Sequence, residues 1–96
     1  MNVVLIPPSD VELDEAIKYY DEQYPGLGED FYREFLRATD LVIKYPDTWR
    51  KVSDNTRRMN IKNFPYLLLY IIDGETILIT CIAHQHRDPS YFADRL

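Results

Sequence analysis

The sequence of 96 residues has little of several features that mark common classes of protein. Cys81 is the only cysteine, which excludes a disulfide framework and a cluster of thiolate metal ligands. The longest uninterrupted apolar run, Tyr66 to Ile72, is far too short to cross a bilayer. No charged and apolar leader is visible. We therefore expect a soluble, cytoplasmic protein without a metal or a cofactor.

Positive charge is also scarce. The chain carries 11 basic and 16 acidic side chains, a formal net charge of -5. Residues 1–53 hold 6 basic and 11 acidic side chains and so carry this charge, whereas residues 54–96 hold 5 of each and are neutral. Non-specific attraction to nucleic acid is not expected of such a chain. With 46% hydrophobic residues, residues 1–96 are expected to form a single domain.

A short strand and two amphipathic helices are predicted in the first half. The strand runs from Asn2 to Ile6 and is closed by Pro7-Pro8. Ser9 and Glu12 fit a capping box, in which each side chain bonds the backbone amide of the other at the start of a helix. A turn at Pro25 to Gly28 separates the two helices. Their buried stripes are expected at Leu13, Ala16, Ile17, Tyr20 and Tyr24, and at Phe31, Phe35, Ala38, Val42 and Tyr45.

Three strands are predicted in the second half. From residue 58 the pattern alternates with a period of two, which is typical of a strand. The apolar runs Tyr66 to Ile72 and Thr76 to Ala83 flank Asp73-Gly74, a dipeptide that favours a type I′ hairpin turn. Because both runs are apolar on both faces, the helix pair is expected to cover the interior of the sheet.

The predicted fold belongs to the α+β class. The order of elements is β-α-α-β-β-β, followed by a short C-terminal helix in which Asp88 is the N-cap and Pro89 the first residue. Helices grouped before a run of strands imply a helical hairpin packed on a small, mainly antiparallel sheet.

Seven short motifs, in order along nearly the whole chain, resemble the RelE/ParE toxin superfamily, whose members are also described as plasmid stabilisation proteins. No single motif carries the resemblance. The motifs are A-x-x-Y-Y (Ala16, Tyr19, Tyr20), P-G-L-G (Pro25 to Gly28), F-x-x-E (Phe31, Glu34), Y-P-x-x-W (Tyr45, Pro46, Trp49), R-R (Arg57, Arg58), F-P-Y-x-x-x-Y (Phe64 to Tyr70) and A-H-x-x-R-x-P-x-Y (Ala83 to Tyr91).

The resemblance implies a RelE/ParE-like fold and the toxin of a type II toxin-antitoxin module, which inhibits growth and is neutralised by a cognate protein antitoxin. Some members of the superfamily are ribosome-dependent endoribonucleases that cut messenger RNA. Others poison DNA gyrase. A third alternative is a decayed toxin that only binds a partner.

Six residues form a candidate functional cluster. RNA cleavage without a metal needs a group to remove the 2′-hydroxyl proton, cations for the phosphate and an acid for the leaving oxygen. The resemblance implies basic groups on the sheet and an arginine and a tyrosine near the C-terminus. The candidates here are Arg58 and Lys62 on one strand face, and His84, His86, Arg87 and Tyr91 after the last strand.

Other observations favour gyrase over RNA as the target. Where the nuclease branch has an arginine just after the leading aromatic of a strand, this chain has Leu67, and the chain is acidic rather than basic. Structural roles for the candidates also stay open. His84 fits a side chain bonded to nearby backbone, Tyr91 fits packing beneath the terminal helix, and Arg58 fits a charged edge strand.

The chain is also rich in aromatic residues, with 8 tyrosines, 4 phenylalanines and 1 tryptophan. These exceed what a small core needs, so some of them are expected to line a groove for the antitoxin. Tyr19, Tyr32 and Trp49 lie off the predicted buried stripes or in a loop, and are the candidate antitoxin contacts.

Overall fold

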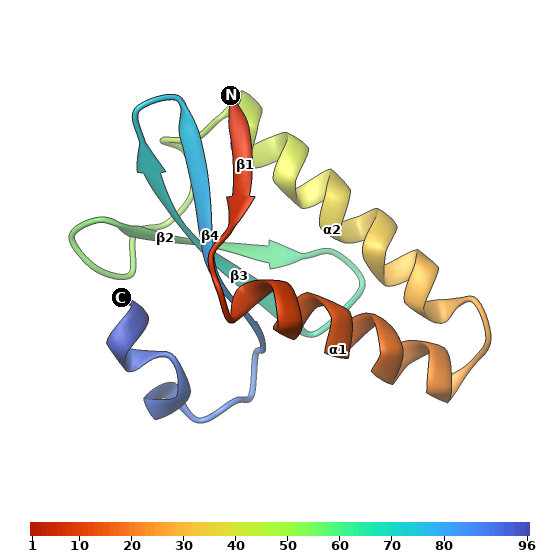
Figure 1. The fold of residues 1–96 in the computed structure, drawn as a ribbon. Helices are drawn as coiled ribbons and strands as arrows, with labels where there is room; N and C mark the ends of the chain where they lie inside the picture. The colour runs from red at the N-terminus through yellow and green to blue at the C-terminus, as the bar shows by residue number, and fades with distance from the viewer.

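The chain forms two helices and a four-stranded sheet in the predicted order β-α-α-β-β-β (Figure 1). The computed structural model describes all residues from 1 to 96. The elements are β1 (Asn2–Leu5), α1 (Ser9–Gln23), α2 (Leu27–Lys44), β2 (Thr56–Ile61), β3 (Tyr66–Asp73) and β4 (Thr76–His84), followed by the 3₁₀ turns η1 (Pro89–Tyr91) and η2 (Ala93–Arg95).

The sheet has the strand order β1-β4-β3-β2 and is mainly antiparallel, as predicted. β2 pairs with β3 and β3 with β4 in antiparallel fashion, whereas β1 pairs with β4 in parallel. β1 is short, and its register with β4 runs only from Thr76 to Ile79. Beyond Ile79, the β1-side edge of β4 therefore has no neighbouring strand, and other groups must take up its backbone hydrogen bonds.

The helical hairpin packs on one face of the sheet and forms the main core with it. α1 contributes Leu13 and Ala16, and α2 contributes the predicted stripe from Phe31 to Val42. Tyr24 and Tyr45 were expected at the ends of these stripes, but they cap the helix C-termini and are 70% and 55% exposed. Neither helix is long and apolar enough to cross a membrane.

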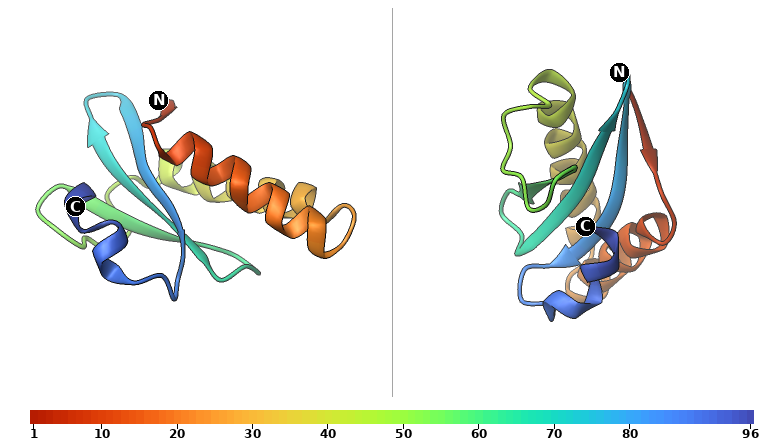
Figure 2. Two further views of the ribbon diagram at one scale, coloured as in Figure 1. Left: turned by 60° about the horizontal axis from the view of Figure 1, so that its bottom comes forward. Right: turned by 90° about the vertical axis from the view of Figure 1, so that its left-hand side faces the viewer.

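The helix pair covers one face of the sheet, as predicted, whereas the second face is covered by the C-terminal turns, for which no prediction was made. Its core consists of Leu67, Leu69, Cys81 and Ala83. The residues packed against this core are Val52, Tyr91 and Phe92. In the right-hand view of Figure 2 the blue C-terminal segment lies in front of the strands, with the helices behind them.

The predicted hairpin between β3 and β4 is present, but its turn lies one residue further along. Asp73 pairs with Thr76, so the two loop residues are Gly74 and Glu75. Gly74 has φ 59°, and no positive φ occurs at Glu75. A type I′ turn needs positive φ at both central positions, so this turn matches type II′, in which glycine takes the first position.

The turn between the helices depends on two glycines. Gly26 is the N-cap of α2 with φ 90°, a conformation that favours glycine. A Cβ atom on Gly28 would lie 2.4 Å from the carbonyl oxygen of Ile17, so a side chain there would force α1 and α2 apart. The Asp21 carboxylate accepts hydrogen bonds from the amides of both glycines, at 3.1 and 3.0 Å. This is the plain helix-helix turn that the sequence suggests, closed by a side chain of α1.

The end of the chain differs from its prediction. Asp88 caps the segment as expected, because its carboxylate accepts a hydrogen bond from the amide of Ser90 at 3.0 Å. However, the segment consists of two 3₁₀ turns instead of one short α-helix. Each turn is only three residues long, which is the usual length for this geometry.

We expect Thr56→Val to stabilise the protein by about 1 kcal/mol. Thr56 in β2 is fully buried, and its hydroxyl has no hydrogen-bond partner. Valine has nearly the same shape and removes the unsatisfied polar atom. Urea unfolding would measure the gain, with Thr39→Val as the control, because the Thr39 hydroxyl donates to the Leu36 carbonyl at 2.8 Å. An equal gain in both variants would contradict this explanation.

Candidate functional site

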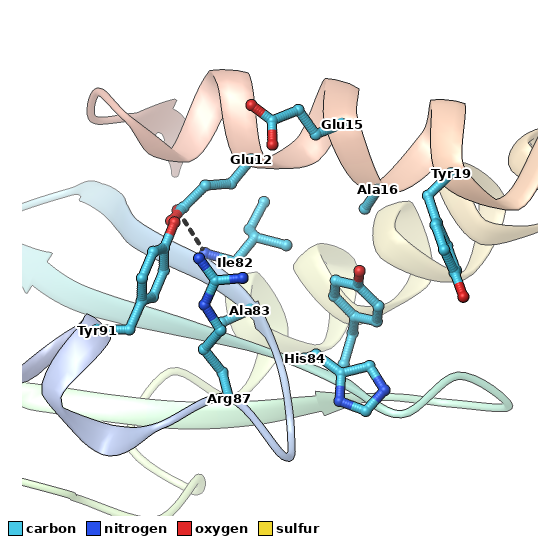
Figure 3. Close-up of a pocket in the computed structure, with 10 residues that line it drawn as sticks. Glu12, Glu15, Ala16, Tyr19, Ile82, Ala83, His84, Arg87 and Tyr91 are labelled. Atoms are coloured by element: carbon cyan, nitrogen blue, oxygen red, sulfur yellow. Dashed lines mark hydrogen bonds between the residues drawn. The ribbon is translucent and has the colours of Figure 1, made fainter.

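The polar residues after β4 line a pocket between α1 and the end of that strand (Figure 3). The pocket has a volume of about 220 Å³. Its floor is the last part of β4, α1 forms one wall, and the segment leading to η1 forms the other. Its main polar and aromatic lining residues are Glu12, Glu15, Tyr19, Tyr66, His84, Arg87 and Tyr91.

Glu12 on α1 is the residue that joins the parts of this corner. It is 8% exposed and does not complete the predicted capping box. Instead, its carboxylate accepts hydrogen bonds from the Tyr91 hydroxyl, from both terminal nitrogens of Arg95, each at 2.9 Å, and from the amide of Ile82 at 3.0 Å. A paired and fully hydrogen-bonded carboxylate can be buried, whereas an unpaired one is costly.

Ser9, the other half of the predicted capping box, serves the same edge of β4. Its hydroxyl oxygen lies 2.6 Å from the Ile6 carbonyl and 2.9 Å from the Ile79 carbonyl, and its single proton is shared between these two acceptors. Arg95 donates to the Thr80 carbonyl at 3.1 Å, next to the Ile82 amide that Glu12 holds. Glu12 and Arg95 thereby satisfy the Ile82 amide and the Thr80 carbonyl, which lie beyond the end of β1, whereas the Ile79 carbonyl also accepts from the backbone amide of Ile6. The pattern Ser-x-x-Glu does not cap α1, because both side chains form hydrogen bonds with the backbone of β4 instead. The capping prediction is therefore wrong.

Arg87 presents an unpaired positive charge at the mouth of the pocket. Its guanidinium carbon lies 3.8 Å from the centre of the Tyr91 ring, a cation–π arrangement. Arg87 forms no ion pair with Asp88, since the Asp88 carboxylate caps Ser90. The side chain of Arg87 is exposed and is available to a partner with negative charge.

The two histidines lie beside each other on the other side of the pocket. Their ring centres are 5.4 Å apart, and the His84 ring packs edge-on against Tyr66 at the same separation. Nδ1 of His84 accepts a hydrogen bond from the backbone amide of His86 at 3.1 Å. The proton of a neutral His84 ring is therefore on Nε2. His84 is half-buried, whereas His86 is exposed.

The hydrogen bonds to Glu12 also change the acidity of its partners. The bond from the Tyr91 hydroxyl, together with burial, raises the pKa of Tyr91. The same carboxylate raises the pKa of Arg95, so the guanidinium keeps its charge at every accessible pH. Tyr91 therefore stays protonated and Arg95 stays charged while the C-terminal turns are bonded to Glu12 on α1.

Comparison with known proteins identifies the family. The chain matches the family model described as "ParE toxin of type II toxin-antitoxin system, parDE" over residues 4–89. The chain belongs to the ParE toxin family. A solved structure entitled "Chromosomal ParDE TA system from P. aeruginosa" has the same fold, with a TM-score of 0.74 at 14% identity, covering 88% of this chain and 95% of that one. No curated protein matches the sequence.

In this ParE-family chain the six candidate residues do not form one cluster. His84, Arg87 and Tyr91 line the pocket, and His86 adjoins His84. Arg58, however, pairs with Leu69, whose side chain belongs to the second face of the sheet, whereas His84 pairs with Tyr66 on the helix side. Directly paired side chains share a face, so Arg58 and His84 point in opposite directions.

Lys62 lies outside the strand on which it was expected. β2 ends at Ile61, and Lys62 is exposed in the turn that follows. Its side chain does not line the pocket that holds His84 and Arg87. The sequence therefore predicts the corner after β4 but not the separation of its residues from the basic groups of β2.

The three candidate antitoxin contacts of this ParE-family toxin differ in exposure. Tyr19 on α1 and Tyr32 on α2 are 52% and 42% exposed and remain available to a partner. Trp49 is half-buried, packs against the helix-side core, and donates from Nε1 to the Leu41 carbonyl at 3.4 Å. Trp49 thus has a structural role, namely covering one end of the helix-side core.

Sequence reasoning missed the structural role of Glu12 and its ion pair with Arg95. One signal was present, because Glu12 lies four residues before Ala16 and so falls on the buried stripe of α1. A carboxylate on an apolar stripe implies a buried partner. The identity of that partner had no signal, since Arg95 is 83 residues away.

Cys81 lies in the core of the second face, against which Tyr91 and Phe92 pack, and is expected to resist alkylation in the native protein. It is fully buried, and burial raises the pKa of its thiol to about 12. The thiolate is the reactive form, so labelling by iodoacetamide at pH 8.5 should be at least tenfold slower in the folded than in the urea-unfolded chain. Equal rates would mean that the C-terminal turns do not cover the second face.

No group of three or more histidine, cysteine, aspartate or glutamate side chains gathers closely enough to hold a metal ion.

Proposed function

We propose that this ParE-family toxin inhibits growth by binding DNA gyrase and blocking its reaction, and that the corner formed by His84, His86, Arg87 and Tyr91 is the surface that makes contact. In this proposal the chain acts by binding and is not an enzyme. It works in the cytoplasm and is neutralised there by its cognate antitoxin.

One observation carries the choice of binding over RNA cleavage: of the three basic candidates, only Arg87 lies with His84 and Tyr91, whereas Arg58 and Lys62 lie away from that corner. A phosphate held by Arg58 on the second face is out of line with the imidazole of His84 on the helix side. Cleavage requires the base, the cations and the acid around one reacting phosphate. The arrangement supports a surface that presents Arg87 to an acidic partner.

The state of Tyr91 supports the same choice. A general acid must release its proton to the leaving oxygen, and its pKa should lie near the working pH. The Tyr91 hydroxyl is instead bonded to Glu12, which raises its pKa. Tyr91 is better suited to positioning the guanidinium of Arg87, which stacks on its ring.

A supercoiling assay with purified proteins tests the proposal. Toxin added to gyrase and relaxed plasmid should stop supercoiling, and addition of the antitoxin should restore it. Normal supercoiling at a saturating concentration of folded toxin would count against gyrase as the target.

A ribosome-dependent endoribonuclease is the second candidate, and the adjacent rings of His84 and His86 favour it. An imidazole ring can both accept and donate a proton, as acid–base cleavage requires. This candidate predicts cleavage of messenger RNA after expression of the toxin, detected as new 5′ ends by primer extension. Full-length messages during growth arrest would exclude it. Expression without any growth arrest would favour a decayed toxin that only binds its partner.

The antitoxin surface proposed here includes Tyr19 and Tyr32 on the helical hairpin. Both side chains are large, apolar and exposed, which is typical of residues that anchor a partner. The half-buried Trp49 contributes at most its exposed edge. Alanine substitution of Tyr19 or Tyr32 should weaken the complex without unfolding the toxin, as measured by calorimetry.

A further inference from the structure

Three side chains of the pocket between α1 and the end of β4 carry hydrogen-bond donors that no group of the chain accepts. They belong to Tyr66, His84 and Arg87, all of which line the pocket. The Glu12 carboxylate in the same pocket is already bonded to three other groups. The free donors are therefore available to an acceptor from outside the chain.

The turn after β4 decides which nitrogen of His84 is a donor. Nδ1 accepts from the His86 amide at 3.1 Å, so a neutral ring carries its proton on Nε2. Nε2 has no hydrogen-bond partner within the chain, and it is not among the buried side-chain atoms that lack one, which are Glu34 Oε2 and Thr56 Oγ1. The Nε2–H group therefore reaches the solvent of the pocket.

The hydroxyl of Tyr66, at the start of β3, is a second donor of this kind. Tyr66 is half-buried, and its unpaired hydroxyl is likewise not among the buried atoms without a partner, so it opens to the pocket that Tyr66 lines. Burial and the neighbouring Tyr19 raise the pKa of Tyr66, whereas the charge of Arg87 lowers it. The hydroxyl keeps its proton at neutral pH, and the guanidinium of Arg87 lies within electrostatic reach of it.

The acidic side chains of the pocket do not occupy these donors. Glu12 is paired with Arg95. Glu15 is exposed, and in Figure 3 its carboxylate lies over α1, whereas the side chains of His84 and Arg87 lie below that helix. The pocket therefore presents one free positive charge, that of Arg87, with two neutral donors beside it.

The size of the pocket limits what can bind there. Its volume of about 220 Å³ lies below the roughly 300–1,000 Å³ of sites that hold drug-sized ligands. A guanidinium forms strong, charge-assisted hydrogen bonds with a carboxylate. The volume and the donors together fit the end of one acidic side chain better than a cofactor.

We propose that this pocket binds the carboxylate of an aspartate or glutamate side chain of gyrase. Arg87 supplies the charge, and the Tyr66 hydroxyl and Nε2–H of His84 supply further hydrogen bonds that select an acceptor at this position. The inference rests on the proposed function. It adds Tyr66, which lies outside the predicted cluster, to the residues that contact gyrase.

The first test separates the two functions of the His84 ring. In His84→Asn the side-chain oxygen can replace Nδ1 as the acceptor for the His86 amide, but the Nε2 donor is lost. In His84→Gln the side-chain nitrogen can replace the Nε2 donor, but the acceptor for the turn is lost. We expect His84→Asn to raise the toxin concentration for half-inhibition of supercoiling about tenfold, and His84→Gln to raise it less than about threefold.

The second test removes one hydroxyl. Tyr66→Phe should weaken supercoiling inhibition about tenfold, because a hydrogen bond to a charged group is lost while the ring is kept. Tyr20→Phe is the matched control. The Tyr20 ring packs edge-on against Tyr66, with centres 5.8 Å apart, but Tyr20 does not line this pocket. Its effect should stay within about twofold.

A small carboxylate tests the pocket in the absence of gyrase. Titration of the wild-type toxin with propionate, followed by NMR, should shift the Nε2–H signal of His84 and the Nε–H signal of Arg87. Propionamide has the same shape without the charge and should leave both signals in place. Tyr66→Phe should need a higher concentration of propionate for the same shifts.

Three results would overturn the inference. They are a His84→Asn variant that inhibits as well as His84→Gln, propionate that moves neither NMR signal, and inorganic phosphate that moves both where propionate does not, which would assign the pocket to a phosphate. Normal supercoiling with the wild-type toxin would instead refute gyrase as the target. The propionate titration would still decide whether the pocket binds a carboxylate, so the two failures are distinguishable.

Discussion

Glu12→Gln should lower the free energy of unfolding by about 3–5 kcal/mol, the largest effect expected of any conservative change in this chain. The substitution keeps the shape of the side chain but removes the charge that Arg95 and Tyr91 both bond. Arg95 is then left as a largely buried cation without its partner. Urea unfolding followed by circular dichroism measures the loss.

Two controls separate the ion pair from other causes. Glu15→Gln makes the same change on the exposed face of α1, one turn away, and should alter stability by less than about 0.5 kcal/mol. Adding Arg95→Met to Glu12→Gln removes the orphaned cation and should restore part of the loss. A Glu12→Gln variant as stable as Glu15→Gln would show that the C-terminal turns are held in another way.

The rate at which Cys81 is alkylated also reports whether the C-terminal turns are packed on the second face of the sheet. Because Tyr91 and Phe92 cover the second face, loosening Glu12 should expose Cys81 before the helix-side core opens. Labelling in Glu12→Gln should therefore be faster than in a helix-side core variant of equal stability, such as Val42→Ala with urea added to match it. Equal rates at equal stability would mean that Cys81 is reached only by global unfolding.

Arg87→Glu should reduce gyrase inhibition and growth arrest at least tenfold while leaving stability within about 0.5 kcal/mol of the wild type. Arg87 is exposed, forms no ion pair, and stacks on Tyr91 at the mouth of the pocket. Reversal of its charge removes the only cation of the corner that no carboxylate holds. The supercoiling assay and the growth of induced cells measure the effect.

Lys62→Glu is the matched control for Arg87→Glu. Lys62 is also exposed and carries the same charge, but it lies in the turn after β2 and does not line the pocket. Its reversal should leave toxicity nearly unchanged. Loss of toxicity in Lys62→Glu with full activity in Arg87→Glu would move the working surface from the corner to the basic edge of β2.

The sequence was sufficient to predict the element order, because each element carries its own local signal. The stripe from Phe31 to Val42 and the paired apolar runs around Gly74 are periodic, and periodicity depends only on neighbours in the chain. The parallel partner of β1 and the cover on the second face have no such signal. Both are decided by contacts between distant segments, such as Tyr91 and Phe92 on the core around Cys81.

The candidate site was predicted only as far as it is local. His84, His86, Arg87 and Tyr91 follow one another closely, and the structure places them around one corner. Arg58 was grouped with them on chemistry and on the resemblance, and the register of β2 with β3 places it on the other face. Glu12 was misread because a nearby serine offered a local explanation, whereas its true partners are Arg95 and Tyr91.

The order in which DNA topology and translation fail after induction of the toxin tests the central claim most directly. Plasmid linking number and incorporation of labelled amino acids are followed in the same culture over the first minutes, with Arg87→Glu as the inactive control. A toxin that binds gyrase through the corner after β4 should relax the plasmid first, while protein synthesis continues and messenger RNA stays intact. Protein synthesis that stops while supercoiling is still normal would contradict the account.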